Sequence, residues 1–340
     1  MPEPSATVPT VSAKLVVISI YYNRSALVSS SVSSVVEQLD DDMHLLLVDD
    51  GSTDDTLAQL ERWQRQNVTV RTQHNMGFVE SIIQAIDGTD SEYIAIHGSG
   101  DLSLPGRFAA QRRVLDSDKT VGVVGCLSLQ RSLNPRVPDH IFGVPFSGDA
   151  RQRIAQKNLF THGEVMMRRT VYEQVGGYRR YFKFAQDRDL WCRMSMVSHF
   201  HVLDRVLYER MIGVADSVTG NPSKFIFQRY FSNFAVHCHR ERLAGCDDPL
   251  TRFGHSAAFI AVDPAPIRKE LSRAFVRSIA QDQQDAAALF LRAYARESGS
   301  AVAQALMRGM LGSRGLRAAI LAILDLGIDI SRRWRAIRSS

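Results

Sequence analysis

The stretch Leu46-Leu47-Val48-Asp49-Asp50-Gly51-Ser52-Thr53-Asp54 joins a short apolar run to a turn that carries carboxylates. An uninterrupted apolar run predicts a strand buried on both faces of a sheet, and the glycine and acids predict the turn that ends it. In open α/β sheets, ligands bind beyond the carboxyl ends of the strands. The stretch therefore predicts an α/β fold and also the edge of the sheet where a ligand binds.

Two later segments have a similar make-up. The segment Tyr93-Ile94-Ala95-Ile96-His97-Gly98-Ser99-Gly100-Asp101 again combines an apolar strand with a turn that ends on a carboxylate. The segment Phe184-Ala185-Gln186-Asp187-Arg188-Asp189-Leu190-Trp191 places carboxylates at the start of a predicted amphipathic helix. Together, the three segments predict a nucleotide pocket with a general base facing it.

Strands and helices alternate along the first two thirds of the chain. The predicted strands cover residues 14–20, 43–48, 68–71, 93–97, 121–126, 165–168, 200–206 and 208–212, and the predicted helices cover 27–38, 52–66, 78–86, 105–114, 170–175 and 186–196. The spacing Ser52-x-x-Asp55 predicts a capping box for the second of these helices. This alternation predicts βαβ units, with helices on both sides of a mostly parallel central sheet.

Three regions depart from the alternation. Residues 131–159 are interrupted by prolines and glycines, which predicts either a functional lid or a plain surface insertion. After Pro222 the pattern is helical only, over 224–243, 265–279, 282–297, 301–310 and 316–340. We expect residues 1–13 to form a disordered tail, since the first seven have neither the basic start nor the apolar core of a signal peptide.

Composition limits the class of protein. The 340 residues are 45% hydrophobic and 23% charged, which is ordinary for one large globular domain with an appendage. The four scattered cysteines favour a reducing cytoplasm over a disulfide framework. Neighbouring side chains of His237-Cys238-His239 would point in different directions on a helix, so we expect no zinc there. No stretch reaches about 18 uncharged apolar residues, so we expect no transmembrane helix.

The net charge of +5 is concentrated at the end of the chain. From Arg314 onward there are six arginines and two aspartates, a balance of +4, so no nucleic-acid groove is predicted across the main domain. From Leu316 onward, a run of apolar residues flanked by arginines predicts a basic amphipathic helix. Such a helix either makes peripheral contact with an anionic membrane or docks on its own domain or in a dimer.

Taken in order, these motifs resemble an inverting glycosyltransferase of family 2, which has the nucleotide-binding fold known as GT-A. Each motif alone is weakly specific, but their order and spacing are specific over residues 14–218. The resemblance rests on Tyr22-Asn23, the Asp49–Asp54 turn, Asn75-Met76-Gly77, Leu104-Pro105-Gly106-Arg107, Gly176-Gly177-Tyr178 and Gln186-Asp187-x-Asp189-Leu190-Trp191.

The resemblance implies an α/β, GT-A-type fold with a mostly parallel central sheet flanked by helices. Residues 14–222 would form the catalytic domain that binds a nucleotide sugar, and residues 223–340 a C-terminal helical region. The implied reaction moves a sugar from a UDP- or dTDP-linked donor to a hydroxyl of a glycan or lipid-linked acceptor. That reaction would serve polysaccharide biosynthesis for the cell envelope, in the cytoplasm or at the inner face of the membrane.

The resemblance also implies roles for single residues. Asp187 would be the general base that deprotonates the acceptor, whereas Asp189 is expected to be structural and Trp191 to lie in the core. Asp49 and Asp50 would contact the nucleoside, although one of them could instead cap the following helix. The residues expected to bind the nucleotide are Tyr22, Asn23, Asp49, Asp50, Asn75, Gly77 and Ser99.

One motif departs from the family. Where the family has Asp-x-Asp-Asp, whose acids hold a divalent ion on the diphosphate, this chain has Gly98-Ser99-Gly100-Asp101. Either a weak Mg²⁺ or Mn²⁺ site remains, formed by Asp101 and the diphosphate with help from His97 or Ser99, or the charge is met by backbone N–H groups and arginines. By position, the candidate arginines are Arg107 and Arg188.

Two rival functions remain. A sugar nucleotidyltransferase usually has a glycine-rich phosphate loop after the first strand, and the residues Tyr21-Tyr22-Asn23-Arg24-Ser25 at that place disfavour it. A non-catalytic relative that binds a glycan or a partner is favoured by the glycines at 98 and 100 and disfavoured by the presence of Asp187.

Overall fold

The computed structural model describes residues 11–132, 138–212, 221–297 and 299–318. The chain divides into two compact units, the first with residues 1–214 and 234–260 and the second with residues 215–233 and 261–340. Helix α8 (Pro222–Leu243) contributes to both. Its second half belongs to the first unit because Phe234 stacks on Phe182. Residues 234–260 thus belong to the first unit by packing, and the functional domains 14–222 and 223–340 remain a prediction.

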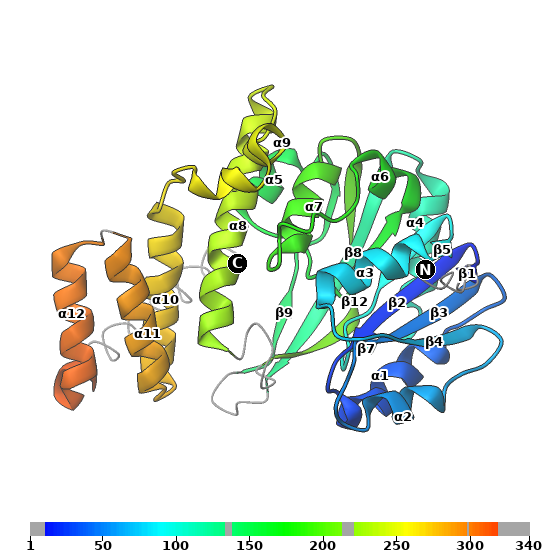
Figure 1. Cartoon of the computed structure of the whole chain (residues 1–340), viewed down its shortest axis with the longest axis horizontal. Coiled ribbons are helices and arrows are strands. Elements are labelled where there is room, and N and C mark those ends of the chain that lie inside the picture. Colours follow the sequence, from blue (N-terminus) through cyan, green and yellow to red (C-terminus); the bar gives the residue numbers. More distant parts are fainter. Residues whose placement is uncertain (1–10, 133–137, 213–220, 298, 319–340) are drawn as a thin grey trace, which may run out of the picture. The chain divides into compact units, whose positions relative to one another are not determined.

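Within the described residues, a ten-stranded sheet forms the centre of the first unit (Figure 1). The strands, in spatial order, are β10 (Phe146–Gly148), β12 (His199–Ile212), β8 (Val121–Ser132), β11 (Met166–Arg168), β6 (Tyr93–Ile96), β2 (Leu15–Tyr21), β3 (Met43–Asp49) and β4 (Val68–Thr72). β7 (Leu102–Ser103) pairs with β12, and β9 (His140–Phe142) pairs with β8. The long ladders β2–β3 and β8–β12 are parallel, and antiparallel β11 joins the two halves.

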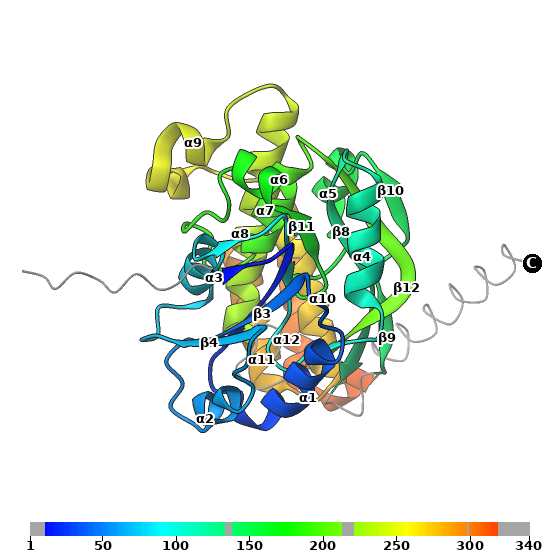
Figure 2. The ribbon, with the colours of Figure 1, turned by 90° about the vertical axis from the view of Figure 1, so that its right-hand side faces the viewer.

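Helices cover both faces of this sheet (Figure 2). One face is covered by α1 (Ser25–Val36), α2 (Thr56–Glu61) and α4 (Arg107–Ser117), and the other by α3 (Phe78–Asp87), α5 (Arg151–Gln156), α6 (Arg169–Gln174) and α7 (Gln186–Met194). Alternate residues of β2 explain the two layers, since Val16 and Ile18 contact the second set and Leu15 and Val17 the first. The predicted α/β class is therefore confirmed.

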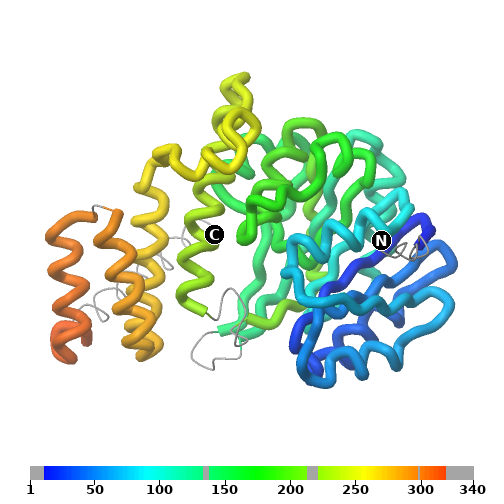
Figure 3. Tube along the Cα trace, viewed as in Figure 1, coloured from blue at the N-terminus to red at the C-terminus, as the bar shows by residue number. Residues whose placement is uncertain are grey.

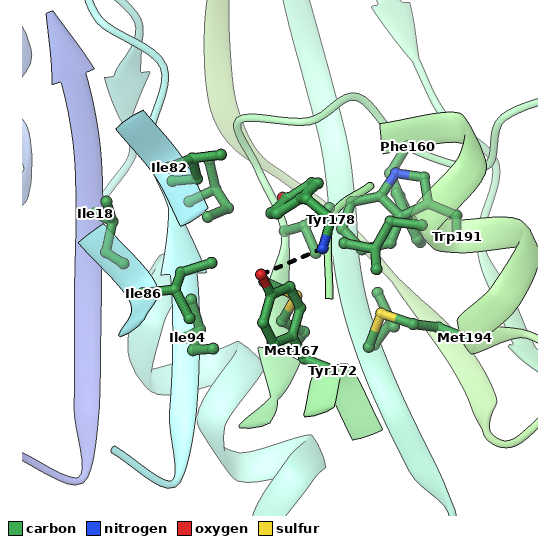
Figure 4. Packing of buried hydrophobic residues seen from close by; sticks show 14 of the residues in the cluster. Ile18, Ile82, Ile86, Ile94, Phe160, Met167, Tyr172, Tyr178, Trp191 and Met194 are labelled. Atoms are coloured by element: carbon green, nitrogen blue, oxygen red, sulfur yellow. Dashed lines mark hydrogen bonds between the residues drawn. The ribbon is translucent and has the colours of Figure 1, made fainter. Parts of the chain in front are cut away.

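The core on the α3 side is continuous across the parallel and antiparallel halves of the sheet. Figure 4 shows Ile82 and Ile86 of α3 beside Ile18 and Ile94, and Trp191 and Met194 of α7 on the far side of Tyr178. The Tyr172 hydroxyl accepts a hydrogen bond from the Tyr178 backbone amide at 3.3 Å, which ties the turn after α6 to this core. The loop that leads into α7 is therefore anchored before the helix begins.

Several local expectations were wrong. Val11 and Ser12 form β1, paired in parallel with β5 (Thr89–Asp90), so the tail cannot extend to residue 13, and residues 1–10 lie outside the described part. The capping box at Ser52 does not form. The helix starts later, at Thr56, whose backbone N–H and hydroxyl both donate to Asp54. The expected irregular region 131–159 contains β9, β10 and α5, and the two late strands form one bulged strand, β12.

The second unit is helical. It contains the first half of α8 together with α10 (Ala265–Ala280), α11 (Gln284–Arg296) and α12 (Ala301–Gly312), which lie side by side in Figure 3. Leu271, Phe275 and Phe290 form the centre of its core.

In the first unit, α8 is followed by α9 (Pro249–Phe253) and a 3₁₀ helix (Gly254–Phe259). None of the described helices has the length and hydropathy to cross a membrane. The predicted amphipathic helix lies outside the described residues from 319 on.

Candidate active site

Three turns meet at one edge of the sheet. Strands β6, β2 and β3 are parallel neighbours, so the turns after them, which start at His97, Tyr22 and Asp50, leave from the same carboxyl edge. β11 runs antiparallel to β6, and the Ile96 amide donates to the Val165 carbonyl at 2.9 Å. The segment before β11, which contains His162, therefore reaches this edge as well.

Asp50 builds one wall of the site. Its carboxylate is 2% exposed and accepts hydrogen bonds from the Met76 amide at 3.0 Å, the Gly77 amide at 3.0 Å and the Ser81 hydroxyl at 2.8 Å. Gly77 has φ 85° and ψ 154°, a conformation that is essentially restricted to glycine. Asp50 thus holds the Asn75–Gly77 turn at the start of α3. Asn75 itself is exposed on this turn.

The turn after β3 is locked to the turn after β2. The Asn23 side-chain oxygen accepts from the Thr53 amide at 2.8 Å, and the Asn23 amide donates to the Ser52 hydroxyl at 3.0 Å. Asn23 has φ 51°, a left-handed value that asparagine tolerates better than most residues. Tyr22 beside it is 46% exposed. The two turns therefore form one surface, with the Tyr22 ring facing solvent.

Asp49 has fewer and longer hydrogen bonds than Asp50. Its carboxylate accepts from the Ser52 amide at 3.3 Å and from the Thr72 hydroxyl at 3.1 Å. Neither acid caps α2, because the acceptor at that helix start is Asp54. The alternative that Asp49 or Asp50 caps the helix that follows them is therefore wrong.

The turn after β6 places Asp101 over Gly98. The Asp101 carboxylate accepts from the Tyr208 hydroxyl at 2.8 Å and from the Met211 amide at 3.2 Å. The Tyr208 hydroxyl in turn accepts from the Gly98 amide at 2.9 Å. A Cβ atom on Gly98 would lie 2.2 Å from the Asp101 Oδ2 atom. Asp101 therefore occupies the space that a side chain at position 98 would need.

The other groups suggested for this turn are engaged within the protein. Both ring nitrogens of His97 hydrogen-bond to serines, Nε2 to Ser31 at 3.0 Å and Nδ1 to Ser103 at 3.1 Å, and burial lowers its pKa to about 3. Both nitrogens of His97 are therefore already engaged, which disfavours the alternative in which His97 helps to hold a metal ion. Ser99 is half-buried on the turn.

The two arginines expected near the diphosphate are also turned away. Arg107 is fully buried, and its guanidinium donates to the Ile96 carbonyl at 2.7 Å and to the Ser103 hydroxyl at 2.8 Å. Arg188 is 6% exposed and donates to the Asn158 side chain. Both arginines therefore have hydrogen-bond acceptors within the protein.

The donor set does not fit a metal held by the protein. Over the described ranges, no group of three or more His, Cys, Asp or Glu side chains lies close enough together to hold an ion. Asp101 is the acid of the turn, and both of its oxygens already accept hydrogen bonds. Mg²⁺ and Mn²⁺ require several oxygen ligands, which these residues do not provide.

Asp187 lies in the first turn of α7. The residue before the helix, Ala185, has φ 53°, an unfavourable value for an alanine that is typical of strained functional turns. The Asp187 side chain is half-buried and accepts from the Arg188 amide at 2.8 Å. Asp189, in contrast, is fully buried and forms ion pairs with Arg179 and Arg193, as its expected structural role requires.

His162 lies on the segment before β11, which reaches the same edge of the sheet. Its Nε2 atom is 2.6 Å from the Tyr178 hydroxyl, and its ring meets Phe78 edge-on with centroids 5.3 Å apart. Burial lowers the pKa of His162, Asp187 raises it and Arg210 lowers it, so His162 lies within electrostatic reach of both. Trp191 is fully buried against Phe160, as expected for a core residue.

Sequence reasoning missed Tyr208 and Arg210 of β12. Side chains two apart on a strand share a face, so Arg210 lies on the same side as Tyr208, whose hydroxyl contacts Asp101. Arg210 is half-buried, and within the described residues its side chain forms no hydrogen bond or ion pair. The signal was the charged pair Glu209-Arg210 inside the otherwise largely apolar stretch Leu207–Ile212.

The fold and the site define a class of protein. The chain shares its fold with the solved structure of mannosyltransferase PcManGT from Pyrobaculum calidifontis in complex with GDP-Man and Mn²⁺. The TM-score is 0.51 and the identity 18%, with 93% of this chain and 86% of that chain covered. It also shares the fold of S. aureus TarS 1–349 in complex with UDP-GlcNAc, with a TM-score of 0.53, 16% identity, and 84% of this chain and 88% of that chain covered. The fold is that of the GT-A glycosyltransferases.

The family follows from the sequence comparison. Residues 16–176 match glycosyl transferase family 2. It is 28% identical over 187 residues to EpsE of Bacillus subtilis strain 168, a protein named as a glycosyltransferase, with 53% of this chain and 66% of EpsE aligned. The aligned part of the chain spans less than two thirds of the length of these curated relatives, 66% in the case of EpsE.

Proposed function

We propose that this protein transfers a sugar, with inversion, from a nucleoside-diphosphate sugar to a hydroxyl group of a glycan or lipid-linked acceptor. The observation that carries the proposal is the half-buried Asp187 carboxylate at the strained start of α7, in a family 2 region whose acidic turns share one sheet edge. Asp187 has no ion-pair partner among the described residues, so its carboxylate is available as a base.

The nucleotide would bind over the turns after β2, β3 and β6. Asp49, with its two long hydrogen bonds, is the acid that we propose contacts the nucleoside, whereas Asp50 holds the turn beneath it. The exposed Tyr22 ring would lie against the nucleoside. Asn23, Asn75, Gly77 and Ser99 complete the proposed nucleotide site. A UDP- or dTDP-linked donor remains our proposal, and the solved neighbours were obtained with GDP-Man and UDP-GlcNAc.

The chemistry is a single displacement. An Asp187 oxygen accepts the proton of the acceptor hydroxyl while the hydroxyl oxygen forms a bond to the anomeric carbon of the donor. The bond from that carbon to the diphosphate oxygen breaks, and the nucleoside diphosphate leaves with the electron pair. Because attack and departure occur on opposite faces of the sugar ring, the anomeric configuration inverts. No step requires a metal held by the protein, and any Mg²⁺ or Mn²⁺ would enter on the diphosphate.

The setting of the reaction is also proposed. A polysaccharide or lipid-linked acceptor places the enzyme in the cytoplasm, with peripheral contact to the inner face of the membrane through residues from 316 onward. A 24% likeness over 159 residues to the amylovoran biosynthesis glycosyltransferase AmsE of Erwinia amylovora supports a role in polysaccharide biosynthesis.

A non-catalytic binding protein is the second candidate, favoured by the glycines at 98 and 100. The test that separates the two is a transfer assay with a panel of UDP-, dTDP- and GDP-sugars and a mixture of glycan acceptors, which follows release of the nucleoside diphosphate. Release that depends on both acceptor and Asp187 supports transfer. Nucleotide binding without release by the intact protein supports the binding role.

A further inference from the structure

The two glycines that replace the family acids are required by their surroundings. Gly98 is covered by the Asp101 carboxylate, and a Cβ atom on Gly100 would lie 2.6 Å from Leu27 Cδ1. Gly100 also has φ 98°, a value that side chains rarely adopt. Neither position can take an acid without moving its neighbours. The turn is thus built without the carboxylates of a metal site.

A diphosphate still needs positive charge when it leaves. Two or more negative charges develop on the leaving group, and an enzyme must stabilise them with a cation, with N–H donors or with both. Asp101 carries the opposite sign, and burial raises its pKa while Arg210 lowers it. A cation must therefore come from another residue close to this turn.

Arg210 is the arginine that fits this requirement. Arg107, Arg188, Arg179 and Arg193 all donate to protein acceptors. Arg210 shares the inner face of β12 with Tyr208 and influences the pKa values of Asp101, His162 and Glu164, which lie around the same edge. A half-buried guanidinium without a protein acceptor is stabilised when it binds an anion, because the anion accepts hydrogen bonds that the protein does not. Its parallel N–H groups match two phosphate oxygens.

We propose that Arg210 binds the diphosphate of the donor and replaces the metal ion that the Asp-x-Asp-Asp acids would otherwise hold. This inference rests on the proposed function, because it names the group that stabilises the leaving diphosphate of the same site. The guanidinium adds positive charge at the turn and needs no divalent cation. The Gly98 and Gly100 amides lie on the same turn, and both already donate within the protein, to Tyr208 and Ser31.

The test compares nucleoside diphosphates with monophosphates in the presence of EDTA. Calorimetry of the full chain would measure Kd for UDP, UMP, dTDP, dTMP, GDP and GMP. The wild type should prefer one diphosphate over its monophosphate, and Arg210→Ala should weaken diphosphate binding roughly tenfold or more while changing monophosphate affinity less than threefold. Arg210→Lys should fall between the two, since it keeps the charge and loses the parallel N–H groups.

Arg205→Ala is the matched control, because Arg205 is an exposed arginine on the same strand. It should leave every Kd unchanged. A thermal melt of each variant establishes that the protein is folded, and Arg210→Gln is the substitute if the alanine variant is not. An unchanged diphosphate preference in Arg210→Ala, or loss of wild-type diphosphate binding on chelation, overturns this inference alone. No binding of any nucleotide by the wild type overturns the proposed function as well.

Discussion

Gly98→Ala tests the arrangement of the turn after β6. The backbone at Gly98 does not have a positive φ, so alanine carries no conformational penalty there, and the cost comes from contact alone. The new Cβ would lie 2.2 Å from Asp101 Oδ2, so the short carboxylate must rotate away. Rotation breaks the bonds to the Tyr208 hydroxyl and the Met211 amide. Each bond to a charged group contributes about 1.5–3 kcal/mol, so we expect a loss of about 2–4 kcal/mol in the free energy of unfolding.

The measurement is urea unfolding followed by tryptophan fluorescence, to which Trp191, fully buried in the first unit, contributes. A double-mutant cycle supplies the control. In an Asp101→Ala background the carboxylate is absent, so adding Gly98→Ala should cost less than about 1 kcal/mol. If Gly98→Ala costs the same in both backgrounds, Asp101 does not occupy the space of residue 98, and our account of the missing acids is refuted.

Four further predictions follow from the structure. Asp187→Asn keeps the shape of the side chain but cannot accept the proton, so the transfer rate should fall at least about a hundredfold while nucleotide Kd changes little; near-normal transfer would remove Asp187 from the mechanism. Burial raises the pKa of Glu164 to about 7, so the folded protein holds this proton more tightly than the unfolded chain does. The stabilisation that the proton provides is complete below the pKa of the unfolded chain and is lost as the pH rises toward 7. In the wild type, Glu164 should lower the free energy of unfolding by roughly 3 kcal/mol between about pH 4.5 and 7, and Glu164→Gln should remove this decrease. An unchanged pH dependence in the variant would contradict the raised pKa. Titration of the protein without nucleotide by millimolar Mn²⁺ should give little heat, because Asp101 offers one occupied carboxylate; strong binding would mean that other ligands complete a site. A chain that ends at residue 315 should lose affinity for anionic liposomes and keep transfer to a short water-soluble acceptor, and an intact protein that ignores such liposomes at low salt would place the last helix against protein instead.

Local pattern was sufficient for the central strands β2, β3 and β6 and for the acids that follow them. The apolar runs of β2, β3 and β6 and the turns that end them were predictable because strand burial and turn chemistry are properties of adjacent residues. The order of the motifs also indicated the family, which residues 16–176 confirm. Errors occurred where a residue had a choice of nearby partners. Ser52 could cap α2, yet its hydroxyl accepts from Asn23, a residue 29 positions earlier in the chain.

The sequence by itself determined the α/β class and the loss of two acids at 98 and 100, and it predicted the carboxyl edge of the sheet as the place of the site. Tertiary structure decided which charges are available at that edge. Arg107 and Arg188 are close to the motifs in sequence but donate into the protein, whereas Arg210, more than 100 residues after Asp101, lies on the strand whose tyrosine holds that acid. The physical reason is that a guanidinium takes its partner from whatever lies within a few ångströms of it, and for residues far apart in the chain only the folding of the sheet decides which groups come that close.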